Sequence, residues 1–456
     1  MLLRPTVSGL LIASLLIGVY FLIPSGLRAI SSTPSPAGET TPISSKIHGA
    51  PTLFGSAGCS GSNCHSQSPA DSQESPQSLW KSSQTIWTLK DPHAQSYETL
   101  LNAKSQAMMK RLYPNENHSA QQDLRCLACH ANPLLVKTLE SKTFTDEQVA
   151  LLREGVSCEA CHGAANAYRS EHVSWTDQTD REKAYSQFGL TRLYDWNVRA
   201  AQCAGCHVGA PASKDQPLRD VNHDFIAAGH PRLNFEFATY LRALPRHWSE
   251  KDRLQGNRPL PVGWEAVAWS AGATERAKAA LGLLADRVER KPWPELAEFN
   301  CFSCHHDLKV AGWRPSSSGR LVWNTLFVPG HDFPGIQKTL QQGDTALLTR
   351  EIAQALFLLK QPVKPLTVDA LLQRLTQSQP LDWDTACQIY YALLVLKETQ
   401  SLNDADKVAL LNLLDQIQKI LKLPRGPEVY NSPREYDPSP LPSLFGQALS
   451  LLKKGG

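Results

Sequence analysis

Four short segments of this 456-residue chain share the pattern C-x-x-C-H, two cysteines three positions apart followed at once by a histidine. They are Cys126–His130, Cys158–His162, Cys203–His207 and Cys301–His305. Side chains three positions apart lie on one face of a helical turn, so both thiols of a motif can reach the same group. The pattern is typical of covalent haem attachment, in which the thiols bond to the porphyrin edge and the imidazole binds the iron. The sequence therefore predicts haem c at all four segments.

Zinc binding and disulfide bonding are the other common uses of paired cysteines. Neither requires a histidine directly after the second cysteine in every copy. We therefore interpret Cys126, Cys129, Cys158, Cys161, Cys203, Cys206, Cys301 and Cys304 as haem-attaching residues, with His130, His162, His207 and His305 as the proximal iron ligands.

A fifth segment, Cys59–His65, has four residues between its cysteines instead of two. Those four residues, with Gly58 before them, are small or turn-forming, as a looped connection between the thiols would need. A disulfide between Cys59 and Cys64 is the alternative. The histidine that follows favours haem, which makes His65 a fifth proximal ligand and gives five haems, or four if this site fails. Cys387 is left over, and we expect a buried apolar thiol.

An iron with one proximal imidazole can take a second histidine on its other face. Nine of the 14 histidines lie outside the motifs and are available for this role. We expect the candidate distal ligands to be His93, His172, His223, His230 and His306, with His48 and His118 in reserve and His247 and His331 less favoured. A seven-residue separation would place His223 and His230 on one face if their segment is helical. Arg232 and Arg314 are candidate partners for haem propionates, or ordinary surface ion-pair residues.

The first thirty residues resemble an export signal. Arg4 precedes an uncharged apolar run, Gly9–Ile23, which suits a cleaved signal better than a membrane span of about 20 residues. An uncleaved N-terminal anchor, which would associate the protein with a membrane, is the alternative. Residues 31–47 are rich in Ser and Pro and predict a linker.

Residues 48–315 form the predicted multihaem domain, with little regular structure around the haems apart from a helix over Trp264–Arg290. Residues 316–456 form a predicted all-helical region. Its amphipathic segments are Asp344–Leu359, Leu366–Leu375, Asp384–Leu396, Asp404–Leu423 and Leu441–Leu452. The expected fold class is mainly α.

Four segments of the chain resemble the cytochrome c-554 family. They are Trp87–Leu100, Gly155–Gly163 with His172, Asn222–Glu236 and Trp293–Leu308. This resemblance implies a mostly helical fold with closely stacked haems and a role as a periplasmic electron carrier. It also implies a relationship to the haem arrangement of hydroxylamine oxidoreductases and multihaem nitrite reductases. The well-known family member has four haems, whereas five are expected here.

The formal net charge of only +3, from 46 Lys+Arg and 43 Asp+Glu, argues against a nucleic-acid partner. The leading expectation is an exported, periplasmic electron carrier that exchanges electrons with redox partner proteins and has no catalytic residue. One alternative is a multihaem oxidoreductase acting on a small nitrogen or sulfur oxyanion, which would require one iron with an open position. Another is a docking subunit that uses its C-terminal helices to bind a partner.

Overall fold

The structure is a computed structural model that describes residues 52–68, 76–139, 143–175, 178–248, 264–290, 293–299, 304, 328, 331, 333–361, 366–377, 381–422 and 436–455. All of them belong to the compact unit Pro42–Gly456. The predicted export signal and linker, together with Cys301, His305, His306, His48 and Arg314, lie outside the described residues.

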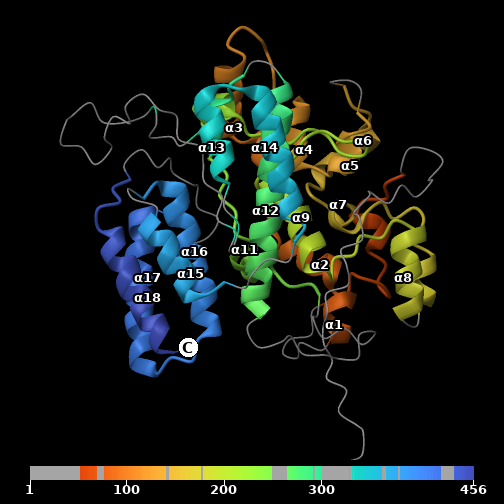
Figure 1. The fold of residues 1–456 in the computed structure, drawn as a ribbon. Coiled ribbons are helices and arrows are strands. Elements are labelled where there is room, and N and C mark those ends of the chain that lie inside the picture. Colours follow the sequence, from red (N-terminus) through yellow and green to blue (C-terminus); the bar gives the residue numbers. More distant parts are fainter. Residues whose placement is uncertain are drawn as a thin grey trace, which may run out of the picture. The chain divides into compact units, whose positions relative to one another are not determined.

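The fold is mainly α, as the sequence predicts (Figure 1). In chain order the helices are α1 Pro76–Lys81, α2 Ser83–Lys90, α3 Ala103–Leu112, α4 Leu124–His130, α5 Pro133–Val136, α6 Asp146–Arg153, α7 Cys158–His162, α8 Gln178–Gln187, α9 Trp196–His207, α10 His223–Ala228, α11 Phe237–Ala243, α12 Trp264–Glu289, α13 Pro334–Gln342, α14 Thr345–Leu358, α15 Val368–Gln377, α16 Trp383–Thr399, α17 Asp404–Leu421 and α18 Leu441–Lys454. In the described part of the chain, β pairing is limited to two isolated bridges, Ala210–Arg219 and Val328–His331.

The part of the chain from Ser56 to His207, which carries four of the motifs, is built from short helices and 3-10 turns. Its 3-10 turns are η1 Ser56–Cys59, η2 Pro92–Gln95, η3 Glu98–Leu101, η4 Ala120–Gln122 and η5 Glu171–Ser174, and η7 Leu296–Glu298 lies further along the chain. Asp and Asn side chains begin several of these elements by accepting backbone N–H bonds. Asp123 begins α4 in this way, and Asp195 begins α9. Short, individually capped elements are a consequence of a sequence without long apolar periodicity.

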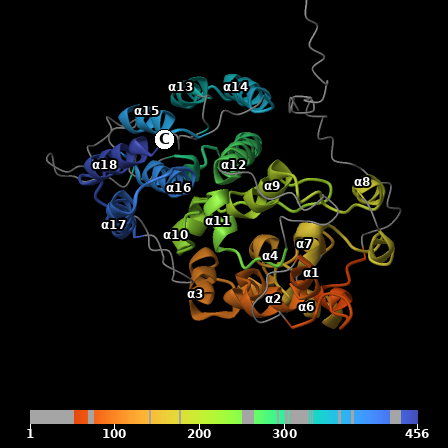
Figure 2. The same ribbon diagram turned by 90° about the horizontal axis from the view of Figure 1, so that it is seen from below.

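Helix α12 is the long helix predicted in this region, and it connects the N-terminal and C-terminal parts. It packs against α9, α11, α14 and α16. Figure 2 shows α9, α11 and α12 between the N-terminal helices and α15–α18. Their apolar faces share one core with the C-terminal helices, which includes Trp269, Phe235 and Tyr390. Burial of this apolar surface joins the two parts of the chain.

The five helices predicted for the C-terminal region are present as α14 to α18, and α13 is an additional helix that the sequence pattern did not reveal. On α17 the apolar stripe formed by Leu410, Leu414, Ile417 and Leu421 is buried, as its spacing predicts. Helix α16 is apolar on almost every side, which fits a central helix, and its Cys387 is fully buried. None of the described helices has the length and apolar character needed to span a membrane.

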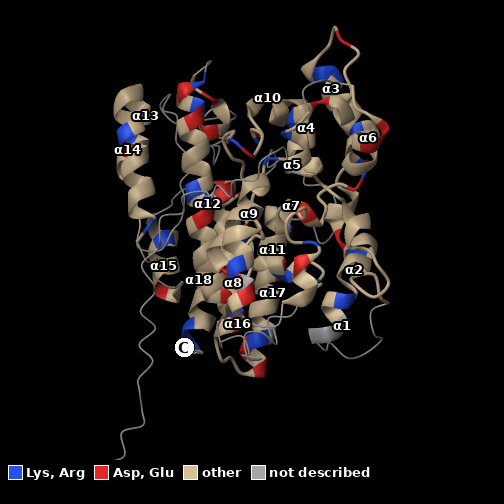
Figure 3. Ribbon diagram, turned by 90° about the vertical axis from the view of Figure 1, so that its right-hand side faces the viewer, with Lys and Arg blue, Asp and Glu red and all other residues tan. Residues whose placement is uncertain are grey.

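Acidic and basic residues are interspersed along helices such as α12 (Figure 3). On α12, Lys278 lies 2.8 Å from Glu275, one turn away. Such pairing of opposite charges agrees with the small net charge of the sequence.

Candidate haem-binding sites

Three of the C-x-x-C-H motifs each form the end of a helix. Helix α4 ends at His130, α7 ends at His162 and α9 ends at His207. The two cysteines and the histidine of each motif therefore belong to one helical turn, as the spacing predicts. After His162 the chain turns sharply at Gly163, whose φ is 85° and where a Cβ atom would lie 2.4 Å from the carbonyl oxygen of Gly189. Only glycine fits this crossing.

The motif with four intervening residues has the expected looped form. Cys59 ends the 3-10 turn η1, and the chain then turns through Gly61–Cys64, where the Cys64 N–H donates to the Gly61 carbonyl at 2.8 Å. In the described part of the chain, Cys59 and Cys64 do not form a disulfide with each other, and the other described cysteines form none either.

Each of three motif histidines lies opposite a histidine from elsewhere in the chain. The ring centroids are separated by 6.1 Å for His65 and His172, 6.1 Å for His207 and His93, and 6.5 Å for His130 and His230. The planes of the first pair are nearly parallel, at 13°, whereas those of the other two are crossed at 83° and 82°. Metal–nitrogen bonds of about 2 Å to two axial imidazoles would put their centroids roughly 6 Å apart. These separations fit one iron between each pair.

Hydrogen bonds orient five of these six rings in the same way. The Nδ1 atoms of His65, His130, His172 and His230 lie 2.7–3.1 Å from the carbonyl oxygens of Trp80, Ser96, Tyr168 and Pro231. The Nδ1 atom of His93 lies 2.9 Å from Oδ1 of Asp91. When the Nδ1–H group donates a hydrogen bond to one of these oxygens, the lone pair of Nε2 is available to bind a metal. This arrangement is common for metal-bound histidine. The donor set therefore fits haem iron.

Burial of the histidine side chains at these sites favours the neutral form of the imidazole ring. Burial lowers the pKa of His162, His207 and His230 to about 4 in each case. Neutral imidazole is the form that binds a metal. For His93, burial acts in the same direction, but the hydrogen bond to Asp91 and the negative charges of Asp91 and Cys206 together outweigh it and raise the pKa.

Cysteines of different motifs touch one another. The sulfur atoms of Cys59 and Cys158 lie close together, and so do those of Cys129 and Cys206. Haems attached to these cysteines would therefore have their porphyrin edges next to each other.

Comparison with known proteins places the motif-bearing part of the chain among c-type cytochromes. The model of the family described as "Cytochrome c554 and c-prime" matches residues 59–163, and the model described as "Cytochrome c7 and related cytochrome c" matches residues 112–222. Cytochrome c-554 of Nitrosomonas europaea is 30% identical over 205 residues, which are 43% of this chain and 83% of that protein. The chain belongs to the cytochrome c-554 family. It is a multihaem c-type cytochrome that binds haem c covalently and transfers electrons. No solved structure matches it.

In this cytochrome, His247, a less favoured candidate in the sequence, affects the proximal histidine of α7. Burial lowers the pKa of His162, and the charges of His247 and His65 lower it further. The Nδ1 atom of His247 is buried and has no hydrogen-bond partner. The His247–Trp248 pair was the signal available in the sequence, but it gives no indication of which motif it would approach.

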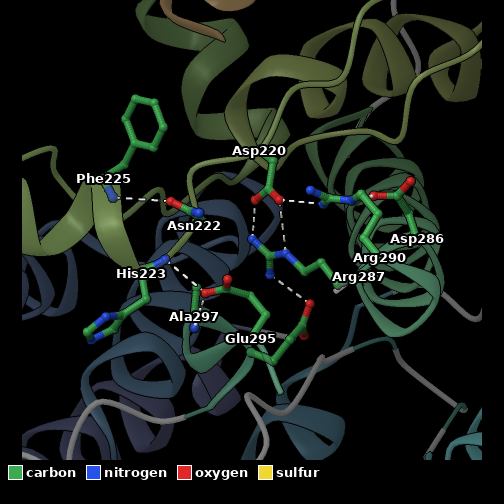
Figure 4. A network of polar contacts seen from close by, with 10 residues as sticks. Asp220, Asn222, His223, Phe225, Asp286, Arg287, Arg290, Glu295 and Ala297 are labelled. Carbon is green, nitrogen blue, oxygen red and sulfur yellow. Dashed lines mark hydrogen bonds and ion pairs between the residues drawn. The ribbon is translucent and has the colours of Figure 1, made fainter. Parts of the chain in front are cut away.

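The other histidines of the described residues have different surroundings. His118 is 3.2 Å from Asp123 and packs against Tyr113, and His331 is 3.2 Å from the Leu358 carbonyl. The backbone N–H of His223 donates to Glu295 at 2.9 Å (Figure 4). Helix α10 begins at His223 but ends at Ala228, so His230 lies beyond it, and the helical face expected to join these two histidines does not form.

In this c-554 family member Arg232, a candidate propionate partner or ion-pair residue, forms an ion pair with Asp384 of α16 at 2.9 Å. Arg219, which the sequence analysis did not single out, lies against the α9 motif, with Nη1 3.8 Å from the Cys206 sulfur. Of the motif Cys301–His305, only Cys304 is described, and it is exposed.

Proposed function

We propose that this chain is a pentahaem cytochrome that works outside the cytoplasm and passes electrons from one redox protein to another through a series of haems with two histidine ligands each. The observation that carries the proposal is the set of three histidine pairs, because each joins one motif histidine to one histidine from outside the motifs at a separation suited to a shared iron.

The proposed ligands follow from these pairs. His65 and His172 would hold the iron of the haem attached to Cys59 and Cys64. His130 and His230 would hold that at Cys126 and Cys129, and His207 and His93 that at Cys203 and Cys206. For the haem at Cys158 and Cys161, with proximal His162, we propose His247 as the second ligand. Cys301, Cys304 and His305 hold the fifth haem, and His223 and His306 are its candidate distal ligands.

Bound haem c supplies one-electron chemistry, since its iron changes between the ferric and ferrous states. The protein's part is to hold both axial rings in place in either state. The Nδ1 hydrogen bonds to backbone carbonyls do this for His65, His130, His172 and His230. Rings held on both faces leave a substrate no position at the metal, which favours an electron carrier over an oxidoreductase.

The cysteine contacts between motifs support a relay. Cys59 touches Cys158, and Cys129 touches Cys206, so each contact links the edges of two haem sites. Electrons would then pass from site to site within the chain, and a partner protein would need to approach only one exposed edge at each end. Export is supported by the apolar segment Gly9–Ile23 after Arg4. The domain plan we propose is an export signal or anchor at 1–30, a linker at 31–47, the haem domain at 48–315 and a helical region at 316–456.

Carbon monoxide binding tests this proposal, because the gas binds ferrous haem only where an axial position is open. We expect the reduced wild-type protein to keep a fully low-spin spectrum under carbon monoxide. A high-spin component that binds the gas in the wild-type protein would overturn the carrier assignment.

A histidine variant tests the ligand assignment with the same assay. His247→Ala should open one iron, so that one haem of the variant binds carbon monoxide. The matched control is His118→Ala, since that ring bonds to Asp123 and has no assigned iron. Equal behaviour of the two variants would remove His247 from the ligand set.

A further inference from the structure

Helix α16 of the C-terminal region reaches a segment that packs on a proximal histidine. The side-chain Nε2 of Gln388 donates to Oδ1 of Asn234 at 2.6 Å and to the carbonyl oxygen of Phe235 at 3.3 Å. All three residues are buried. A buried amide with such partners is well ordered, because losing the bonds would leave polar atoms unsatisfied.

The segment held by Gln388 covers the ring of His207. Phe235 stacks on His207 with centroids 5.5 Å apart and planes at 20°, and Tyr240 meets it edge-on at 5.2 Å and 71°. The Tyr240 hydroxyl donates to the backbone carbonyl of Asn234 at 2.7 Å. Both rings against His207 are therefore tied to the residue that Gln388 binds.

The segment has little freedom to move away from His207. Behind it, α12 is so close that a Cβ atom at Gly272 would lie 2.3 Å from the Cβ of Phe237. Phe235 and Phe237 are 2% and 1% exposed. Close packing of this kind fixes the rotamers of the rings that it surrounds.

We propose that Gln388 is a positioning residue for His207: through Asn234 and Phe235 it fixes the plane of this axial imidazole, and thereby the magnetic and redox properties of the iron between His207 and His93. The inference rests on the proposed ligation of that haem. The plane of an axial imidazole selects the iron d orbital with which it interacts, and groups packed around a metal ligand tune the metal through that orientation.

This inference gives the C-terminal helices a specific role. The family models match residues 59–163 and 112–222, whereas Gln388 lies far outside both ranges. The helices beyond the matched part would adjust one haem of the relay from behind its proximal ligand.

The test compares Gln388→Leu with Arg242→Gln in the full-length holoprotein. The Leu variant removes the amide at similar size. The control breaks an ion pair between α11 and α16, in which Arg242 lies 2.7 Å from Glu398, but leaves Asn234 and Phe235 bonded to Gln388.

We expect the EPR signal of one crossed-imidazole haem to shift in the Leu variant alone. In a redox titration, the reduced-to-oxidised ratio of one haem at fixed potential should change about threefold or more.

The signal of the near-parallel pair, His65 and His172, is the internal standard, since Gln388 has no contact with it. Unchanged spectra and potentials in Gln388→Leu, or equal shifts in the Arg242→Gln control, would overturn the inference. Tyr240→Phe is the second variant, because it keeps the ring and removes only the bond to Asn234. In Tyr240→Phe, we expect the EPR signal of the His207 and His93 pair to shift and that of the His65 and His172 pair to stay unchanged.

The proposed function fails in a different way. A wild-type protein that lacks any low-spin haem at Cys203 and Cys206 would disprove the ligation itself. A wild-type protein with that haem, but with no response to Gln388→Leu or Tyr240→Phe, would disprove only the positioning role.

Discussion

The imidazole rings of His65 and His172 lie almost parallel, with their planes at 13° and their centroids 6.1 Å apart. The two other pairs, His93 with His207 and His130 with His230, are crossed at 83° and 82°. In low-spin ferric haem, parallel axial rings split the iron d orbitals strongly and give a rhombic EPR signal, whereas crossed rings give a highly anisotropic signal at low field. We predict both kinds of signal in the oxidised protein.

Replacing His172 by Ala connects the rhombic signal to its source. The variant should lose the rhombic low-spin signal and gain a high-spin one, while the anisotropic signals of the crossed pairs remain. EPR of the oxidised variant at low temperature is the measurement. Loss of an anisotropic signal instead would show that His172 serves a different iron.

The double variant Cys59→Ala/Cys64→Ala should reduce the number of covalent haems by one. Cys64 follows the looped connection from Cys59, and without both thiols the haem of this motif has no covalent bond to the chain. Mass spectrometry of the denatured protein counts the attached haems. Cys387→Ala is the control, because this thiol is buried within the C-terminal core and should have no haem. A full haem complement in the double variant would show that no haem is attached at this motif.

The motifs themselves were predictable because their chemistry is local. Two thiols and an imidazole within five residues define a site without reference to the rest of the chain, and α4, α7 and α9 end at the motif histidines as the spacing indicates. The C-terminal helices were predictable for a similar reason, since apolar spacing such as that on α17 is local, and Asp344, Asp382 and Asn403 cap α14, α16 and α17.

The ring pairs were not predictable, because each joins residues distant in sequence. The sequence named His93, His172 and His230 as distal candidates but contains no local signal that His93 faces His207 or that His130 faces His230. For His247, which we propose as the second ligand of the iron at His162, the neighbour Trp248 indicates only an aromatic environment. Phe235 was missed because its contact with His207 depends on how α11, α12 and α16 pack.

Removing Arg287 should destabilise the protein strongly. Its guanidinium bonds to Asp220 and, at 2.7 Å, to Glu298, and all three side chains are 7–8% exposed (Figure 4). Arg287→Met leaves two buried carboxylates without this partner, which costs about 3–5 kcal/mol. Urea unfolding followed by circular dichroism measures the loss.

Two further variants separate charge burial from other effects of the Arg287 substitution. Arg290→Gln should cost about 0–1 kcal/mol, because this side chain is 43% exposed although it also bonds to Asp220. Adding Asp220→Asn and Glu298→Gln to Arg287→Met should recover part of the stability, since no unpaired charge then remains. A triple variant as unstable as Arg287→Met alone would contradict this explanation.

Glu398 should contribute stability that depends on pH. The hydrogen bond from Arg242 lowers the pKa of Glu398 from 4.5 to about 2 in the folded protein. The carboxylate is therefore favoured by folding, and its contribution is fully present above pH 4.5 and disappears as the pH falls towards 2. Glu398→Gln should lower the unfolding free energy at pH 7 by about 1 kcal/mol, because the pair is partly exposed and screened by solvent. Thermal unfolding of both proteins between pH 3 and 7 gives the difference, in which effects of pH on the rest of the molecule cancel. We expect this difference to shrink steadily below pH 4.5, whereas a constant difference would show that the bond between Arg242 and Glu398 does not depend on the charge of the carboxylate.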